Sequence, residues 1–231
     1  MSTATPVGRA ATALLVAGDH LDQPEFHRRY EATPAGTKAE LIDGVVSLPS
    51  PVSRDHGKAQ LAVAAWLSDY VENTPGVEAF DNPTVILGRL SEPQPDFALL
   101  IRPESGGQTI DDPTYIRGAP ELVIEVSKTT RYLDLGPKLN GYQQAGVPEY
   151  VVRALDPDDV LWFRRADAVF QRVAPDADGL YRSAIFPGLW LDPQALLSGD
   201  TRRLRQVVEQ GAATPQHAAF VARLAEKRAK T

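Results

Sequence analysis

The strongest hydrophobic pattern in the chain begins after Ser53. Apolar side chains recur three and four positions apart as far as Val71, which predicts a long amphipathic helix with Ser53 as its N-cap. A shorter helix is predicted over residues 22–32, where Asp22 is the N-cap candidate and Pro24 falls in the first turn. The first part of the chain is therefore expected to contribute two helices.

Short extended segments dominate the middle of the chain. Residues 38–48 predict a β-hairpin, because the Asp43-Gly44 pair provides the positive φ angles that a tight turn requires. Four more apolar runs predict strands, at residues 77–80, 84–87, 97–101 and 122–126. The last two runs are almost entirely apolar, as expected of strands that are covered on both faces.

A helix and further strands follow. Residues 134–145 predict one helix that ends at Gly146, and residues 150–155 predict the next strand. Because a strand precedes this helix at residues 122–126, the succession indicates a right-handed crossover. The remaining strands are predicted at residues 160–164, 168–173 and 180–185, the first two as a hairpin.

The chain turns helical and basic from Asp200 onward. This tail carries seven basic and three acidic side chains, a net charge of +4, which leaves −10 on the rest of the chain. Gly211 and Pro215 divide the tail into two helices, which either dock or dimerise with one solvated face or form a basic arm that touches nucleic acid. The sequence predicts three regions: a mobile leader (1–20), a main domain (21–198) and a helical basic tail (199–231).

Composition narrows the possible chemistry. The 231 residues include no cysteine, which excludes disulfides, thiolate metal sites and a cysteine nucleophile. No apolar run reaches the roughly 20 residues of a membrane-spanning helix, so we expect a soluble, cytoplasmic protein without a membrane partner. With a net charge of −6, any nucleic acid would have to be held by a local basic patch. The motifs of kinases, dehydrogenases, serine hydrolases and zincins are absent.

Two acidic residues stand in apolar surroundings. Asp96 opens the apolar run FALLI, and Glu125 lies inside the run LVIEV, 29 residues later. An ionised carboxylate in a covered strand is costly unless it is paired or binds a metal. If the two strands are neighbours, both carboxylates could share a divalent cation such as Mg²⁺. Asp96 could equally be a turn residue at a strand edge, and Glu125 a salt-bridged carboxylate.

Several motifs surround these two residues in a fixed order. They are ELIDG at residues 40–44, Ser50-Pro51, His56, Pro95-Asp96, Gly118-Ala119-Pro120, Glu125-Val126-Ser127, a helix with Asp134, Lys138 and Tyr142, and GVPEYVV at residues 146–152. Across residues 22–190 this order resembles the Uma-type family of bacterial proteins, which is grouped with restriction endonucleases. That family belongs to the larger PD-(D/E)XK nuclease superfamily.

The resemblance implies a restriction-endonuclease-like fold of the α/β (α+β) class: a mixed central sheet flanked by helices, with extra hairpin strands and a C-terminal helical tail. It also implies that Asp96 and Glu125 bind Mg²⁺ or Mn²⁺, with the Val126 carbonyl as a third oxygen ligand. The superfamily pattern has a lysine two residues after the glutamate, where this chain has Ser127. Lys128 comes next, but strand alternation points it away from Glu125.

In the family that this chain resembles, the lysine role lies on the following helix, at a position that Lys138 matches. Asp134, Lys138 and Tyr142 stand four positions apart, so they would share one helix face, and Asp134 could orient Lys138 as an ion pair. An ammonium group can position the attacking water and offset charge that grows on a phosphate. Without a nearby sheet, the same residues would form an ordinary solvated helix face.

The resemblance also implies roles for Glu40 and His56. Glu40 would approach the metal from the opposite side, and His56 would contact the water or the scissile phosphate. The residues alone also permit purely structural roles for Glu40 and His56. Glu40 could pair with a surface arginine, and His56 could be a solvated or capping residue in the first turn of its helix.

We therefore predict an endonuclease that hydrolyses DNA phosphodiester bonds with a water activated by Mg²⁺. A homodimer is one possible assembly, because cutting two strands commonly uses two copies of one site. Because the chain before the tail is acidic, a second class of function is also possible. The protein could be a catalytically inactive nuclease fold that serves as a nucleic-acid or protein interaction module. A carboxylate-pair hydrolase of a neutral substrate such as a glycoside is a third alternative.

Overall fold

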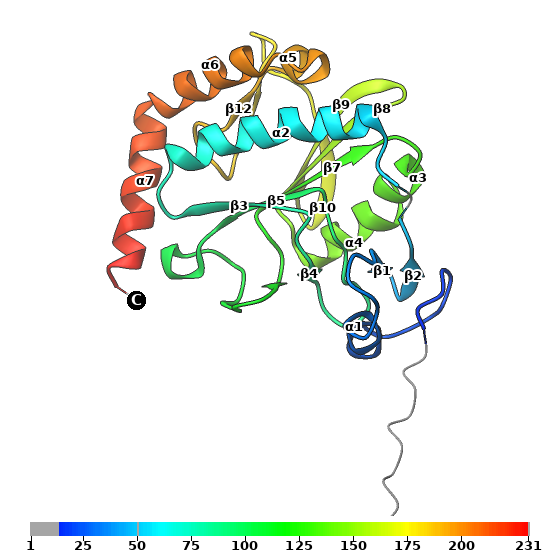
Figure 1. Cartoon of the computed structure of the whole chain (residues 1–231). Helices are drawn as coiled ribbons and strands as arrows, with labels where there is room; N and C mark the ends of the chain where they lie inside the picture. Colours follow the sequence, from blue (N-terminus) through cyan, green and yellow to red (C-terminus); the bar gives the residue numbers. More distant parts are fainter. Residues whose placement is uncertain (1–13, 50, 231) are drawn as a thin grey trace, which may run out of the picture.

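A six-stranded mixed sheet lies at the centre of the protein (Figure 1), of which the computed structural model describes residues 14–49 and 51–230. Residues 1–13 of the predicted leader lie outside the described residues. From one edge of the sheet to the other, the strands are β10 (Val169–Val173), β9 (Asp158–Ala166), β8 (Glu149–Leu155), β7 (Leu122–Ser127), β5 (Phe97–Ile101) and β3 (Val77–Asp81). Neighbours are antiparallel except for β7 and β8, which run parallel.

The parallel pair is joined by a crossover of two helices, α3 (Arg131–Asp134) and α4 (Pro137–Ala145). The prediction of one continuous helix over residues 134–145 is therefore wrong. Gly136 interrupts it with φ −122° and ψ −103°, and Pro137 begins α4 as its first residue. A Cβ atom on Gly136 would lie 2.6 Å from the carbonyl oxygen of Tyr132, so only glycine fits this break.

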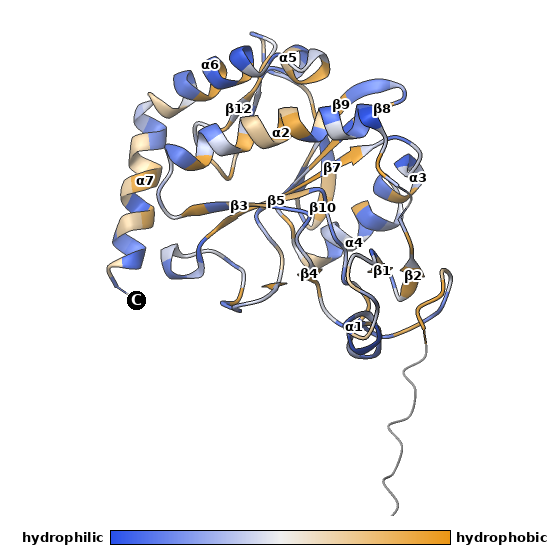
Figure 2. Ribbon diagram, viewed as in Figure 1, coloured by the Kyte–Doolittle hydropathy of each residue, from blue (hydrophilic) through white to orange (hydrophobic). Residues whose placement is uncertain are grey.

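Helix α2 (Arg54–Glu72) covers the opposite face of the sheet from α4, as its apolar stripe predicts. Ser53 caps it, since the Ser53 hydroxyl accepts a hydrogen bond from the His56 backbone N–H at 3.3 Å. Trp66 of α2 is fully buried and packs edge-on against Trp162 of β9, with ring centroids 6.1 Å apart. In Figure 2 the arrow of β7 is orange, whereas α2 alternates between orange and blue turns.

Three helices end the chain: α5 (Pro193–Ser198), α6 (Thr201–Ala212) and α7 (Pro215–Arg228). The first two pack beside α2, and α7 runs crosswise past the end of β3 (Figure 1). The predicted division of the tail at Gly211 and Pro215 is confirmed to within one or two residues. Leu204 and Val208 of α6, with Phe220 and Leu224 of α7, are buried in the same hydrophobic cluster as α2. The tail helices therefore contribute to the main core.

The predicted helix and hairpin near the N-terminus are present. They are α1 (Gln23–Tyr30), β1 (Glu40–Ile42) and β2 (Val45–Ser47). The turn of the hairpin has φ 50° at Asp43 and φ 76° at Gly44, which is the positive pair that a tight hairpin turn needs. A small apolar cluster holds α1 against this hairpin.

The remaining elements are short. They are β4 (Val85–Ile86), the 3-10 turn η1 (Pro103–Ser105), β6 (Ile116–Arg117), β11 (Tyr181–Arg182) and β12 (Trp190–Leu191). The strand predicted over residues 180–185 shrinks to the two residues of β11, because the Ser183 hydroxyl accepts hydrogen bonds from the Ile185 and Phe186 N–H groups and turns the chain there. Within the described residues, no helix combines the length and the apolar character needed to cross a bilayer.

Candidate active site

A cleft of about 510 Å³ opens where β5 begins and β7 ends. The antiparallel register of these strands places Phe97 opposite Ile124, which brings Asp96 beside Glu125. The Asp96 Oδ2 atom accepts a hydrogen bond from the Val126 backbone N–H at 2.6 Å. The two carboxylates that stood out in the sequence therefore line the same cleft, on neighbouring strands.

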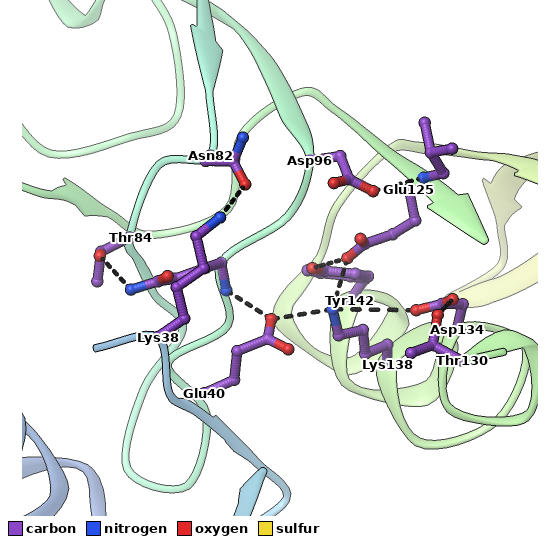
Figure 3. A network of polar contacts seen from close by, with 12 residues as sticks. Lys38, Glu40, Asn82, Thr84, Asp96, Glu125, Thr130, Asp134, Lys138 and Tyr142 are labelled. Atoms are coloured by element: carbon purple, nitrogen blue, oxygen red, sulfur yellow. Dashed lines mark hydrogen bonds and ion pairs between the residues drawn. The ribbon is translucent and has the colours of Figure 1, made fainter. Parts of the chain in front are cut away.

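Lys138 joins these strands from α4 (Figure 3). Its Nζ atom donates to Glu125 Oε1 at 3.0 Å and lies 2.9 Å from Glu40 Oε1. The Tyr142 hydroxyl donates to the same Glu125 oxygen at 2.9 Å. Because the Lys138 side chain is only 7% exposed, it is part of the buried network and not a solvated helix face.

Asp134 supports this group from the end of α3. Asp134 Oδ1 lies 3.9 Å from Lys138 Nζ, and Asp134 Oδ2 accepts a hydrogen bond from the Thr130 hydroxyl at 2.8 Å. Ser127 is fully buried at the end of β7, and its hydroxyl makes no hydrogen bond within the described residues. The helix break changes the shared face that we predicted: Asp134 closes α3, and only Lys138 and Tyr142 share a face of α4.

Glu40 and His56 also lie in the cleft. Glu40 accepts a hydrogen bond from the Gln94 backbone N–H at 2.8 Å in addition to its contact with Lys138, so its cation is this buried lysine and not a surface arginine. His56 reaches Asp96 instead of solvent, with Nε2 3.2 Å from Asp96 Oδ1.

Lys128 lies outside the carboxylate network. It pairs with Asp55 at 3.0 Å on the surface, on the rim of the cleft. This position agrees with the prediction from strand alternation that Lys128 does not point toward Glu125.

Gln60 contacts Asp96 and was not identified from the sequence. Its Nε2 atom donates to Asp96 Oδ1 at 2.6 Å, so Asp96 accepts hydrogen bonds from Gln60 and from the Val126 N–H and is also in contact with His56. The available signal was the spacing of His56 and Gln60, four positions apart in a helix whose apolar stripe was evident.

Burial and charge shift the titration of the central carboxyl. Burial raises the pKa of Glu125 well above its ordinary value, against the opposing effect of the Lys138 ammonium. The neighbouring carboxylates raise it further: Asp134, Asp96 and Glu40. Burial also raises the pKa of Asp134. Both shifts favour the protonated, uncharged forms of these two carboxyl groups.

The two groups that donate to Glu125 keep their protons at neutral pH. Burial alone would lower the pKa of Lys138, but the carboxylates of Glu125 and Glu40 raise it above its ordinary value. Burial raises the pKa of the Tyr142 hydroxyl well above its ordinary value, and the Glu125 carboxylate adds to the rise. Lys138 is therefore a permanent cation in this site.

The donors in the cleft match a hard divalent cation in chemical type. Carboxylate oxygens of Asp96 and Glu125, with the Val126 carbonyl, are the ligands that Mg²⁺ accepts together with water. Three acidic side chains lie 2.9–3.9 Å from the Lys138 ammonium, namely Glu40, Glu125 and Asp134, and a divalent cation would favour their ionised forms. Among the residues that the structure describes, no three Asp, Glu or His side chains are arranged as a complete metal site.

The mixed sheet and its flanking helices recur in a solved structure. This structure, described as a putative nuclease belonging to DUF820 from Anabaena variabilis, superposes with a TM-score of 0.58 at 17% sequence identity. The match covers 74% of this chain and 97% of that protein.

The sequence comparison is more specific. The chain belongs to the Uma2 family, described as "Putative restriction endonuclease", whose family model matches residues 23–194. The resemblance and the fold class predicted from the sequence are thereby confirmed. No curated protein matches the sequence.

Proposed function

We propose that the protein is a Mg²⁺-dependent DNA endonuclease, with Mn²⁺ as an alternative ion. The observation that carries the proposal is the position of Lys138, whose ammonium is held between Glu125 and Glu40 in the cleft that Asp96 lines. This arrangement supports a PD-(D/E)XK type of site in which the lysine comes from α4 instead of β7. Hydrolysis would leave a 5′-phosphate and a 3′-hydroxyl.

In this proposal Asp96, Glu125 and the Val126 carbonyl would hold the ion. When bound, the ion supplies an activated water and stabilises charge on the phosphate. Lys138 positions the attacking water and offsets negative charge that grows on the phosphate oxygens. Lys138 stays protonated because carboxylates surround it, so it acts as an electrostatic group and not as a base.

The other residues of the cleft keep these groups in place. Glu40 and Asp134 fix the Lys138 ammonium, and Tyr142 and Lys138 together orient the Glu125 carboxylate. His56 contacts Asp96 and lines the open side of the cleft, where it can also meet the scissile phosphate. Such supporting contacts typically change metal affinity or activity about 10–100-fold when they are removed.

The proposal is tested by incubating plasmid DNA and single-stranded circular DNA with Mg²⁺ or Mn²⁺ and either wild type, Asp96→Asn or Glu125→Gln. We expect metal-dependent cleavage by wild type and none by either variant. Glu149→Gln is the matched control, because Glu149 is a fully buried carboxylate on β8 that bonds Ser183 away from the cleft. Cleavage that persists in both site variants would refute the assignment.

One observation favours the non-catalytic alternative. Both oxygens of Asp96 and the Oε1 atom of Glu125 are already engaged by protein groups, so the cleft is stable as a polar network without an ion. Calorimetric titration of Mg²⁺ into wild type and Glu125→Gln separates the two functions. Saturable binding that the variant loses supports the nuclease, whereas DNA binding without metal binding or cleavage supports an interaction module.

Assembly and location complete the proposal. Cutting both strands of a duplex commonly uses two copies of one site, and two-fold symmetry is the commonest oligomeric arrangement, so we propose a homodimer. Gel filtration at several protein concentrations tests this. We also propose that the protein acts in the cytoplasm.

A further inference from the structure

A second hollow of about 240 Å³ adjoins the cleft. It lies between the first turns of α2, the end of β8 and the end of α5, which packs beside α2 (Figure 1). Lys128 lines both the cleft and this side hollow, so the two spaces share a wall. The charged side chains that line the side hollow are Lys58, Lys128, Arg153, Asp55 and Asp158.

Arg153 forms the floor of the side hollow. It is the register partner of Val126 on the neighbouring parallel strand, so it stands beside the residue that we assign to the ion. Arg153 is only 3% exposed, and its guanidinium contacts the carbonyls of Ala154 and Leu197. Its Nε atom is buried and makes no hydrogen bond within the described part of the chain. A buried donor of this kind requires an explanation.

A phosphate group suits this guanidinium. The planar fork of arginine matches the oxygens of phosphate in pairs, and hydrogen bonds between such charged groups are stronger than neutral ones. At present Arg153 pairs with Asp158 at 2.6 Å, but the Asp158 side chain is 56% exposed. Because the Asp158 carboxylate is exposed, it can turn into water while a ligand phosphate takes its place on the buried guanidinium, which then keeps an anionic partner.

Two lysines stand above Arg153 at the mouth of the side hollow. Lys128 pairs with Asp55, whose side chain is 72% exposed, and this pair is similarly exchangeable. Lys58 is exposed on the second turn of α2, and its Cε atom lies 3.6 Å from the position of a Cβ on Gly199. Its side chain therefore spans the gap between α2 and the end of α5, where it adds positive charge to the mouth.

We propose that the side hollow binds a phosphate of the nucleic-acid strand next to the one in the cleft. The proposal rests on the proposed function for its substrate class. The strand would pass from the cleft over Lys128 to Lys58, with Arg153 beneath it. The residues before the tail carry a formal charge of −10, which would repel DNA. The cations of the side hollow explain how DNA would nevertheless be held next to the carboxylates of the cleft.

The test measures binding of a short fluorescein-labelled DNA duplex by anisotropy, over a series of KCl concentrations, without divalent metal so that no cleavage occurs. Lys58→Gln and Lys128→Gln change exposed side chains and leave the core intact. Each is expected to weaken binding and to lower the slope of log affinity against log salt by about one, and the double variant by about two. Arg89→Gln is the matched control, because the Arg89 side chain is 87% exposed, pairs with Asp22 and lines neither the cleft nor the side hollow.

The outcomes separate the side hollow from the proposed function. Reduced slopes in the two lysine variants, with an unchanged slope in Arg89→Gln, support the phosphate site. Equal changes in all three variants, or none in the lysine variants, overturn it even if wild type cleaves DNA. Wild type that binds with the predicted slopes but never cleaves would refute the endonuclease and leave the binding site standing. Wild type that fails to bind at low salt overturns both.

Discussion

At the scale of single residues, Lys138 balances a buried group of carboxylates. Removal of one partner from a buried ion pair leaves the others uncompensated, which typically costs several kcal/mol. We predict that Lys138→Met lowers the free energy of unfolding by about 3 kcal/mol at neutral pH. Urea denaturation would measure this, with Lys38→Met as the exposed control. Equal effects of the two substitutions would show that Glu125 and Glu40 do not depend on the Lys138 charge.

Gln60 provides the second residue-scale prediction. Because Gln60 donates at 2.6 Å to Asp96 Oδ1, Gln60→Leu removes the shorter of the two side-chain contacts, with Gln60 and His56, that hold that oxygen. We expect cleavage to fall about 10–100-fold, with a higher Mg²⁺ concentration needed for half-maximal rate. Gln206→Leu on the exposed side of α6 is the control. An unchanged Mg²⁺ dependence in Gln60→Leu would make Gln60 a structural residue only.

The sequence could predict some of these residues and not others. Asp96 and Glu125 stood out because charge is rare inside apolar strands, and the structure brings them together as neighbouring strands allow. Lys138 was assigned only through the family resemblance, since nothing in its local pattern separates it from a surface lysine. Gln60 was missed because a neutral amide in an amphipathic helix gives no signal until its partner strand is known.

At the scale of elements, the break between α3 and α4 decides where Lys138 points. A Cβ on Gly136 would collide with the Tyr132 carbonyl oxygen at 2.6 Å. We predict that Gly136→Ala destabilises the protein by about 1–3 kcal/mol and lowers cleavage although Lys138 is unchanged. Thermal unfolding and the cleavage assay would measure the two effects.

Gly141→Ala in the same helix is the matched control. Its added methyl group would meet only the Ser91 hydroxyl at 3.9 Å, an ordinary contact, so alanine should stabilise α4 by up to about 1 kcal/mol. Similar effects of the two substitutions would contradict a special role for the break. The sequence pattern missed this break because the polar residues Asp134, Lys138 and Tyr142 keep a helical spacing across it, and the steric conflict arises from backbone geometry.

The docking of α7 is expected to depend on pH through His217. This side chain is 5% exposed, and its Nε2 atom lies 3.0 Å from the Thr74 hydroxyl at the end of α2. Burial lowers the pKa of His217 below its ordinary value of 6.5. Between these two values the unfolded chain binds the proton and the folded protein does not, so stability falls as the pH drops below about 6.5.

The substitution His217→Gln removes this titration and keeps a polar side chain near Thr74. We predict that the stability advantage of wild type over the variant shrinks as the pH is lowered from neutral to acid. Thermal melts across that pH range would measure it. A constant difference would show that His217 is equally protonated in both states.

At the scale of the whole molecule, the strands of the central sheet could be predicted more reliably than the short strands outside it. Alternating and continuous apolar runs marked all six strands of the central sheet, and the helix between β7 and β8 marked the parallel pair. The strand β11 was predicted too long and β12 was not predicted, because the pairing of two-residue strands depends on contacts that the local pattern does not show. The sequence also suggested a separate basic tail after residue 198. The composition becomes basic there, and a sequence alone does not show which residues the tail helices pack against.

The last prediction concerns that tail. Phe220 is 1% exposed and meets Phe186 edge-on at 6.3 Å, and it shares its cluster with Trp66 of α2. We predict that Phe220→Ala costs about 3–5 kcal/mol and that a chain ending at Gly199 loses cooperative unfolding, because the core that α6 and α7 cover would face water. Calorimetry on both variants would measure this. A shortened chain that kept the melting temperature of wild type would instead make residues 199–231 an independent tail, and a basic arm would then be free to reach nucleic acid.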